Sequence, residues 1–334
     1  MKKLLLSALF IYFVSASVAV AAEYKLLNVS YDATRELFQD YNQAFSRHYK
    51  EKFGDDVTVS QSHGGSAVQA RSVVDGIPAD VVSLSIELDL DYIAEQSGKI
   101  EKDWVKKFPN NSAPFTSAII FLVRKGNPKG IHDWSDLIEK DAEIITPNPK
   151  TSAIARYNYL AAYAYADAKY NGDENKIKDF ITTFYSKVPV LDTAVRGATN
   201  TFVQKNIGDV LLTWENEAHL SLKKMGADKF EIVVPSISII AKPQVAVVTE
   251  NAKKHGTLKV AEEYVNFLYS DEGQEIIAKH YYRPSNPDIL NKHKSKFVDI
   301  KLVDVDKYGG LRRFGQKHFA DGAWFDQILQ KLHK

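Results

Sequence analysis

The sequence predicts an α/β protein of two lobes that are joined by strands crossing between them. Strand-like and helix-like segments alternate along most of the chain, a pattern typical of largely parallel sheets covered by helices. A length of 334 residues favours two units over one. No proline-rich or low-complexity linker separates two units, so we expect lobes that share crossing strands and close by a hinge.

The predicted elements repeat one design, in which a strand ends in a tight polar turn that leads into a helix. The first helix places Leu37, Tyr41, Phe45 and Tyr49 on one face, and Asp32 or Thr34 is positioned to cap it. The expected strands are 24–29, 57–59, 80–84, 117–123, 143–146, 189–191, 209–213, 230–234 and 244–248. The other expected helices are 67–74, 89–96, 134–139, 152–169, 200–205, 215–224, 258–268, 273–280 and 318–332.

The first 22 residues have the three parts of a cleavable secretory signal peptide. Lys2 and Lys3 precede an apolar run from Leu4 to Val14, and small residues follow up to Ala22. The apolar run of about 11 residues is too short to span a bilayer. We therefore expect cleavage after Ala21 or Ala22 and export to the periplasm, and the absence of cysteine excludes a lipid anchor at that point.

Composition excludes several classes of function. Removing the two leader lysines reduces 43 basic residues to 41, against 42 acidic residues, so the mature chain lacks the charge of a nucleic-acid binder. Without cysteine there are no disulfides, iron–sulfur clusters or thiol nucleophiles. The nine histidines show no zinc-binding spacing, so we expect neither a metal nor a cofactor.

The turns at strand ends are candidates for an anion site. A helix N-terminus exposes unpaired N–H groups and a partial positive charge, so several helices aimed at one point can hold an anion. The turns with this character are 31–32, 64–66, 151–152 and 213–214. Any one of these turns taken alone is more often an ordinary helix cap, and Trp214 taken alone is equally consistent with a core residue.

An enzyme is the alternative from a different class. Ser62 and His63 are neighbours whose side chains point apart in an extended segment, and the sequence has no G-x-S-x-G elbow. A hydrolase needs an activated nucleophile, and none is visible, so we expect no enzymatic activity. A purely structural or interaction role predicts no ligand cleft and no stabilisation by a ligand.

The sequence resembles the periplasmic sulfate-binding proteins of sulfate/thiosulfate ABC importers over nearly the whole mature chain. The stretches that carry the resemblance are 26–32 (LLNVSYD), 61–66 (QSHGGS), 121–128 (FLVRKGNP), 146–150 (TPNPK), 208–217 (GDVLLTWENE), 272–275 (EGQE) and 318–322 (HFADG). The resemblance implies a type II-like, two-lobed solute-binding protein with a ligand cleft between lobes joined by hinge strands. The implied lobes are 23–118 plus 243–334, and 119–242.

The resemblance also implies the ligand and its contacts. Sulfate would lie in a dehydrated cleft and receive hydrogen bonds from Asp32, Ser66, Ser152, Ala153, Ile154, Val195 and Trp214. The family usually has two glycines where this chain has Ala153 and Ile154, and often alanine in place of Val195, so the turns here are more crowded. Thiosulfate or another tetrahedral oxyanion, such as molybdate or phosphate, is the alternative ligand. The implied partner is a membrane permease, and the protein is expected to be a monomer.

Overall fold

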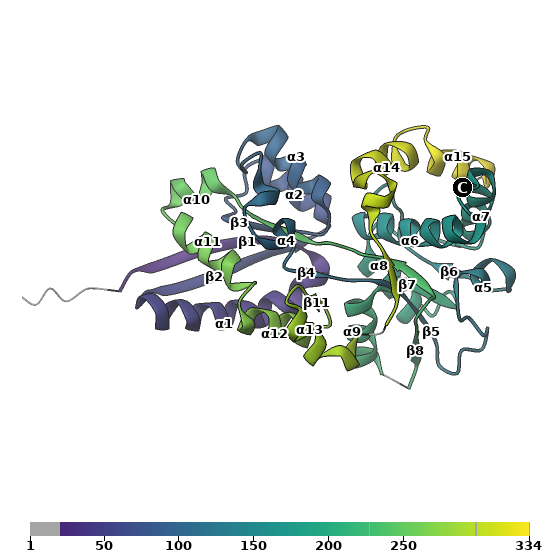
Figure 1. Ribbon diagram of the computed structural model, residues 1–334, viewed down its shortest axis with the longest axis horizontal. Helices are drawn as coiled ribbons and strands as arrows, with labels where there is room; N and C mark the ends of the chain where they lie inside the picture. Colours follow the sequence, from purple (N-terminus) through teal and green to yellow (C-terminus); the bar gives the residue numbers. More distant parts are fainter. Residues whose placement is uncertain (1–20, 227, 298, 334) are drawn as a thin grey trace, which may run out of the picture.

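Two four-stranded sheets, each covered by helices, lie side by side in the computed structural model (Figure 1). The structure describes residues 21–226, 228–297 and 299–333. The expected signal peptide at 1–22 therefore falls, except for its last two residues, outside the described chain. No helix within the described ranges is both long and apolar enough to cross a membrane. We call the part built on the sheet that contains the N-terminal strand the first lobe, and the other part the second lobe.

The strands are β1 (Glu23–Tyr31), β2 (Asp56–Gly64), β3 (Val81–Leu84), β4 (Phe115–Thr116), β5 (Ile119–Arg124), β6 (Ile144–Ile145), β7 (Val210–Trp214), β8 (Phe230–Val233), β9 (Ile237–Ile239), β10 (Gln244–Val247), β11 (Arg283–Pro284) and β12 (Lys301–Val303). The helices are α1 (Arg35–Phe53), α2 (Ser66–Val74), α3 (Glu87–Ser97), α4 (Pro109–Ser112), α5 (Trp134–Glu139), α6 (Ala153–Tyr170), α7 (Glu174–Ser186), α8 (Val195–Val203), α9 (Glu215–Met225), α10 (Thr249–His255), α11 (Leu258–Phe267), α12 (Asp271–Lys279), α13 (Pro287–Lys292), α14 (Gly310–Phe319) and α15 (Trp324–Lys331).

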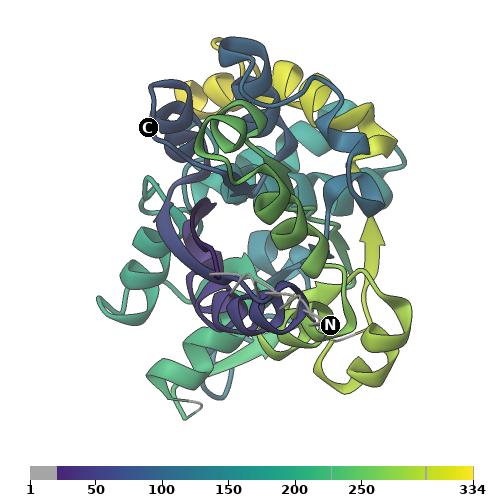
Figure 2. The ribbon, with the colours of Figure 1, turned by 90° about the vertical axis from the view of Figure 1, so that its left-hand side faces the viewer.

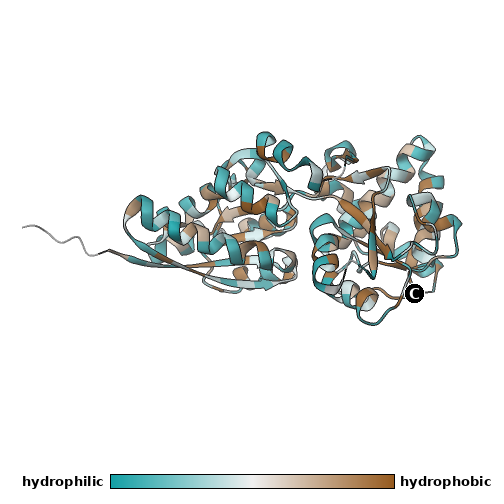
Figure 3. Ribbon diagram, turned by 90° about the horizontal axis from the view of Figure 1, so that it is seen from below, coloured by the Kyte–Doolittle hydropathy of each residue, from teal (hydrophilic) through white to brown (hydrophobic). Residues whose placement is uncertain are grey.

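The first sheet has the strand order β10-β3-β1-β2, in which β1 pairs in parallel with β2 and β3. Helix α1 covers one face of it and α2 and α3 cover the other (Figures 1 and 2). The apolar face predicted for α1 is confirmed, because Leu37, Tyr41, Phe45 and Tyr49 are all buried. Hydrophobic residues accordingly gather on the strands and the inward sides of the helices (Figure 3).

The second sheet has the order β6-β7-β5-β8, and here the expectation of largely parallel pairing is wrong. Strand β6 is parallel to β7, but β5 is antiparallel to both β7 and β8. The first sheet holds one similar strand, β10, which is antiparallel to β3. Both β5 and β10 enter their sheets from the opposite lobe. Strand–helix alternation indicates that strands linked by helices are parallel, but it says nothing about the direction of a strand that arrives from elsewhere.

Two segments cross between the lobes and pair with each other at the crossing. Ser117 and Ala241 form an antiparallel bridge, with N–H···O distances of 3.0 Å and 2.9 Å. Nearby, the N–H of Ile119 donates to Ser238 Oγ at 2.9 Å. Beside them, Arg283 Nε lies 2.7 Å from the buried carboxylate of Glu215. This paired region is the expected hinge.

The C-terminal segment crosses a third time and packs on the second lobe. Strand β12 pairs in parallel with β9, and helices α14 and α15 lie beside α6 and α7 (Figure 1). The ring of Phe325 packs 5.0 Å from that of Tyr185, centroid to centroid. The sequence-based division assigned all of 243–334 to the first lobe, whereas residues 301–331 lie against the second.

Other differences from the sequence expectations have local causes. The strand expected at 189–191 does not form; Pro189 has no N–H to donate to a neighbouring strand. The helix expected at 200–205 starts earlier, as α8 at Val195. The helix expected at 318–332 starts later, as α15 at Trp324, because residues 318–319 end α14 and a turn in which Gly322 has φ +74° follows. Helix α7 was not predicted.

Candidate functional site

A small cavity of about 60 Å³ lies between the lobes, where four turns meet. Two of these turns come from the first lobe, after β1 and β2, and two from the second, before α6 and α8. The cavity is lined by Tyr31, Asp32, Ala33, Gly64, Gly65, Ser66, Ser85, Thr151, Ser152, Ala153, Ile154, Ala194, Val195 and Arg196. Six of the seven predicted site residues are in this lining.

The turn after β1 brings Asp32 to the cavity but does not use it as a cap. A 3-10 turn, Asp32–Thr34, separates β1 from α1, and neither Asp32 nor Thr34 caps α1 with its side chain. Instead, Asp32 Oδ1 accepts from Arg35 Nη2 at 2.7 Å, and Thr34 Oγ1 donates to the carbonyl of Tyr31 at 2.7 Å. The expectation that one of these side chains caps the helix is therefore wrong: Asp32 lies one short turn ahead of α1, and Thr34 occupies the N-cap position but its hydroxyl bonds to the carbonyl of Tyr31 instead.

Ser66 is the first residue of α2, and its hydroxyl is engaged within its own lobe. Its Oγ accepts from the N–H of Ser85 at 3.1 Å, and the hydroxyl bonds to the carboxyl group of Asp89. Burial raises the pKa of Asp89 to about 6, although the bond from Ser66 lowers it. The backbone N–H of Ser66, at the start of α2, is the group that remains available to the cavity.

The second lobe supplies the N-termini of α6 and α8. Ser152 caps α6, because its Oγ accepts from the N–H of Ala155 at 3.3 Å. The N–H groups of Ala153 and Ile154 find no acceptor in the described part of the chain. The cap position of α8 is Ala194, which has no side-chain acceptor, so the N–H of Val195 is also left open.

Hydrogen bonds fix these two turns relative to each other. The N–H of Asn148 donates to the carbonyl of Asp192 at 2.8 Å, and Thr151 Oγ1 donates to the carbonyl of Thr193 at 2.9 Å. The two helix N-termini are thus held as one unit. A rigid pair of this kind can present several donors to one small ligand without reorganisation.

Trp214 does not line the cavity but lies against a residue that does. Its ring packs edge-on against that of Tyr31, with centroids 5.7 Å apart. The side chain is fully buried, and its indole N–H has no hydrogen-bond partner among the described residues. A buried donor without a partner costs about 1–3 kcal/mol, so an unpaired indole beside a cavity points to a missing acceptor.

Arg196 is the charged residue of the site that sequence reasoning missed. Its Nε lies 3.2 Å from Glu217 Oε2 of its own lobe, and its Nη2 lies 3.4 Å from Glu36 Oε2 of the first lobe. Asp32 is farther away, at 3.9 Å. Burial lowers the pKa of Arg196, but these carboxylates outweigh it and raise the pKa above its usual value. A lone arginine in a turn gives no sequence signal, because its partners come from other elements.

Chemistry by a serine nucleophile has little support from the geometry. The Ser62–His63 pair considered from the sequence is not a dyad, because His63 Nδ1 instead lies 2.6 Å from Ser30 Oγ. Ser30 is fully buried on β1, so its hydroxyl cannot reach a substrate. Within the described residues, no group of three histidine, aspartate or glutamate side chains is placed to hold a metal ion.

Comparisons with known proteins agree with this architecture. Residues 26–283 match the family model described as bacterial extracellular solute-binding protein. The chain is 53% identical over 321 residues to the sulfate-binding protein of Escherichia coli strain K12, covering 96% of this chain and 97% of that protein. It is 47% identical over 329 residues to the thiosulfate-binding protein of Pseudomonas aeruginosa, covering 98% and 99%.

Solved structures show the same fold. The sulfate-binding protein SubI from Mycobacterium tuberculosis H37Rv superposes with a TM-score of 0.80 at 32% identity, covering 89% of this chain and 99% of that one. A periplasmic thiamin binding protein superposes with a TM-score of 0.65 at 15% identity, covering 93% and 96%, which shows a shared fold alone.

Proposed function

Because the chain belongs to the bacterial extracellular solute-binding proteins, and within them to the group of sulfate- and thiosulfate-binding proteins, we propose that it binds sulfate between its lobes. It acts in the periplasm, after removal of the leader at 1–22, and delivers the anion to the permease of an ABC importer. It does so as a monomer and without catalysing a reaction.

The observation that carries the proposal is the convergence of helix N-termini on one small cavity. Sulfate is a dianion whose four oxygens only accept hydrogen bonds, so a site made of N–H and O–H donors suits it. The proposed donors are Asp32, Ser66, Ala153, Ile154 and Val195 through their backbone N–H groups, with the hydroxyl of Ser152 and the indole of Trp214.

The charge of the anion is balanced by dipoles more than by a free cation. Arg196 lines the cavity, but its guanidinium is shared among the carboxylates of Glu217, Glu36 and Asp32. Each helix N-terminus carries a partial charge of roughly half an electron, and several of them aimed at one point act together. The anion is thus held without an exclusive salt bridge.

Phosphate is expected to be rejected by the same donors. Near neutral pH phosphate keeps at least one proton, and that proton needs an acceptor or stays unpaired in a dry site at about 1–3 kcal/mol. The Asp32 carboxylate, the obvious acceptor in the lining, is already paired with Arg35. Polar sites discriminate strongly against a ligand that leaves such a group unpaired.

Thiosulfate is the second candidate, and the thiosulfate-binding relatives favour it. It is also a dianion without protons at neutral pH, so donor chemistry alone does not separate it from sulfate. Its terminal sulfur is larger than oxygen, and the side chains of Ile154 and Val195 narrow the cavity. We therefore place sulfate first.

The experiment that tests the proposal is a thermal melt of protein stripped of bound anions. A ligand that binds only the native state stabilises it by ~2.7 kcal/mol at a hundredfold excess over its dissociation constant. Sulfate is expected to raise the Tm clearly, whereas equal concentrations of chloride and phosphate do not. No shift with sulfate would contradict the proposal.

A further inference from the structure

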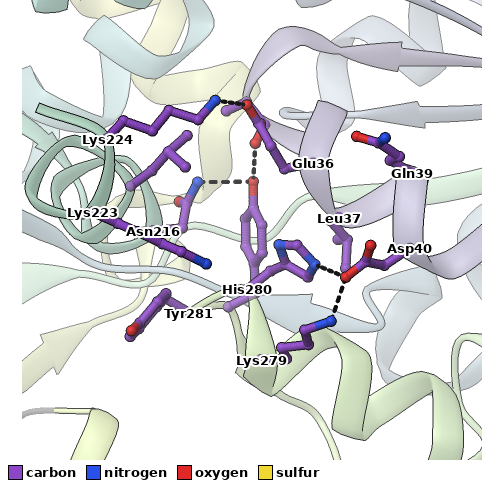
Figure 4. A pocket seen from close by; sticks show the side chains of 13 residues that line it. Glu36, Leu37, Gln39, Asp40, Asn216, Lys223, Lys224, Lys279, His280 and Tyr281 are labelled. Atoms are coloured by element: carbon purple, nitrogen blue, oxygen red, sulfur yellow. Dashed lines mark hydrogen bonds and ion pairs between the residues drawn. The ribbon is translucent and has the colours of Figure 1, made fainter.

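A second, larger pocket of about 290 Å³ also lies between the lobes (Figure 4). Helix α1 and residues 279–282 of the first lobe form one wall, and helix α9 of the second lobe forms the other. Ala33 belongs to the lining of both this pocket and the small cavity proposed to bind sulfate, so the two spaces are neighbours. Ion pairs across this pocket therefore bear directly on whether the cleft is closed.

Glu36 is the residue of α1 on which cations of the opposite lobe converge. Its Oε1 lies 2.5 Å from Lys224 Nζ, a contact drawn in Figure 4, and its Oε2 lies 3.4 Å from Arg196 Nη2. Burial raises the pKa of Glu36, but Lys224 and Arg196 outweigh it and hold the pKa below its usual value. Glu36 is therefore ionised and paired twice across the cleft.

Asp40, the other acidic residue in the lining of this pocket, pairs within one lobe. Asp40 lies 2.6 Å from Lys279 Nζ and 3.0 Å from His280 Nε2, and all three residues belong to the first lobe. Arg196 also has a partner in its own lobe, Glu217, at 3.2 Å. If the lobes separate, Arg196 keeps that partner, whereas Glu36 loses both of its cations.

On the other side of the cleft, the lobes meet through a more exposed contact. Arg312 of α14 lies 3.0 Å from Asp91 and 2.9 Å from Glu95, both on α3. The side chains of Arg312 and Asp91 are 55% and 25% exposed, close to the 49% and 21% of Lys224 and Glu36. Arg196, the second cation beside Glu36, is only 32% exposed, so its pair with Glu36 is the contact between the lobes that solvent screens less.

We propose that Glu36 stabilises the closed state through its ion pairs across the cleft, and so raises ligand affinity without touching the ligand. The inference rests on the proposed function, because closure matters only if a ligand binds in the cleft. For a ligand that binds only the closed form, the apparent affinity is the intrinsic affinity multiplied by the fraction of protein that is closed. Pairing that exists only in the closed form raises that fraction and slows release.

The test is the variant Glu36→Gln, which keeps the size of the side chain and removes its charge. We expect sulfate to bind about three- to tenfold more weakly, mainly through faster dissociation measured by stopped flow. The matched control is Glu263→Gln. Glu263 pairs with Lys52 at 3.0 Å, is 25% exposed, and has its partner in the same lobe. This control is expected to bind sulfate like the parent.

A double variant identifies the partner. Adding Lys224→Gln to Glu36→Gln is expected to weaken binding less than the product of the two single effects, because the pair is already broken. Unchanged affinity in Glu36→Gln, or an equal loss in Glu263→Gln, would overturn the proposal. If the parent binds no sulfate, the proposed function fails instead. The effect of Glu36 on closure is then tested by small-angle X-ray scattering of ligand-free protein. Equal radii of gyration for the parent and Glu36→Gln would overturn the proposal.

Discussion

Replacing Trp214 with phenylalanine separates a role in ligand binding from a role in packing. The indole is fully buried, and its N–H has no partner among the residues that the structure describes. In the complex it is expected to donate to the dianion, and a hydrogen bond to a charged group contributes ~1.5–3 kcal/mol. Trp214→Phe should therefore weaken sulfate binding by about ten- to more than a hundredfold.

The stability of the ligand-free protein should change much less. The smaller ring loses some packing, but the variant also removes a buried donor that costs about 1–3 kcal/mol while it is unpaired. These two effects oppose each other. The Tm without ligand is therefore expected to fall only slightly, while the increase in Tm caused by sulfate shrinks strongly.

Trp134 provides a matched control in the same lobe. It is also fully buried, but its Nε1 donates to the carbonyl of Ile237 at 2.8 Å. Trp134→Phe leaves that carbonyl unpaired, so it should lower the Tm more than Trp214→Phe does and leave sulfate affinity unchanged. Calorimetric titration and thermal melts of both variants measure the contrast. If Trp214→Phe binds sulfate like the parent, the assignment of the indole as a donor is refuted.

Three further predictions concern single residues. Ser152→Ala removes both the cap of α6, at a cost of ~0.5–2 kcal/mol in stability, and a proposed ligand donor, so urea unfolding and sulfate titration should both show a loss. Val195→Ala enlarges the cavity and should raise the affinity for molybdate relative to sulfate in competition titrations; an unchanged ratio would show that this side chain does not set the size limit. Burial raises the pKa of Glu217 to about 7, although Arg196 lowers it. The folded state then binds that proton more tightly than the unfolded state does, and stability falls as pH rises from the usual value of 4.5 to about 7. Glu217→Gln should flatten that part of the Tm–pH curve.

Local patterns were sufficient to predict the strands of the first sheet, the helices α1, α2 and α3 that cover it, and three of the four turns of the site. The spacing of Leu37, Tyr41, Phe45 and Tyr49 identified α1, and these side chains are buried as expected. The turns after β1 and β2 lie together because these two strands pair in one sheet, whereas the turns before α6 and α8 are joined by hydrogen bonds between residues 148–151 and 192–193. The sequence also contained a signal for α7 that was overlooked: Asp173 caps it by accepting from Asn175 and Lys176.

Contacts between distant elements could not be predicted from local patterns. Arg196 is notable only because Glu36 and Glu217 reach it from two other helices. The reversed direction of β5 follows from its origin in the other lobe, and the position of residues 301–331 follows from a third crossing. Periodicity reports which face of an element is buried, but it does not report which lobe covers that face.

The most direct test of the central claim is calorimetric titration of anion-free protein with sulfate, thiosulfate, phosphate and molybdate at one pH. A site built from helix N-termini and the Trp214 indole predicts saturable binding of one sulfate per chain, with phosphate bound far more weakly because its proton finds no acceptor. If sulfate does not bind, the proposed function is contradicted. If phosphate binds within about tenfold of sulfate, an acceptor must face the cavity, and the account of a donor-only site is contradicted.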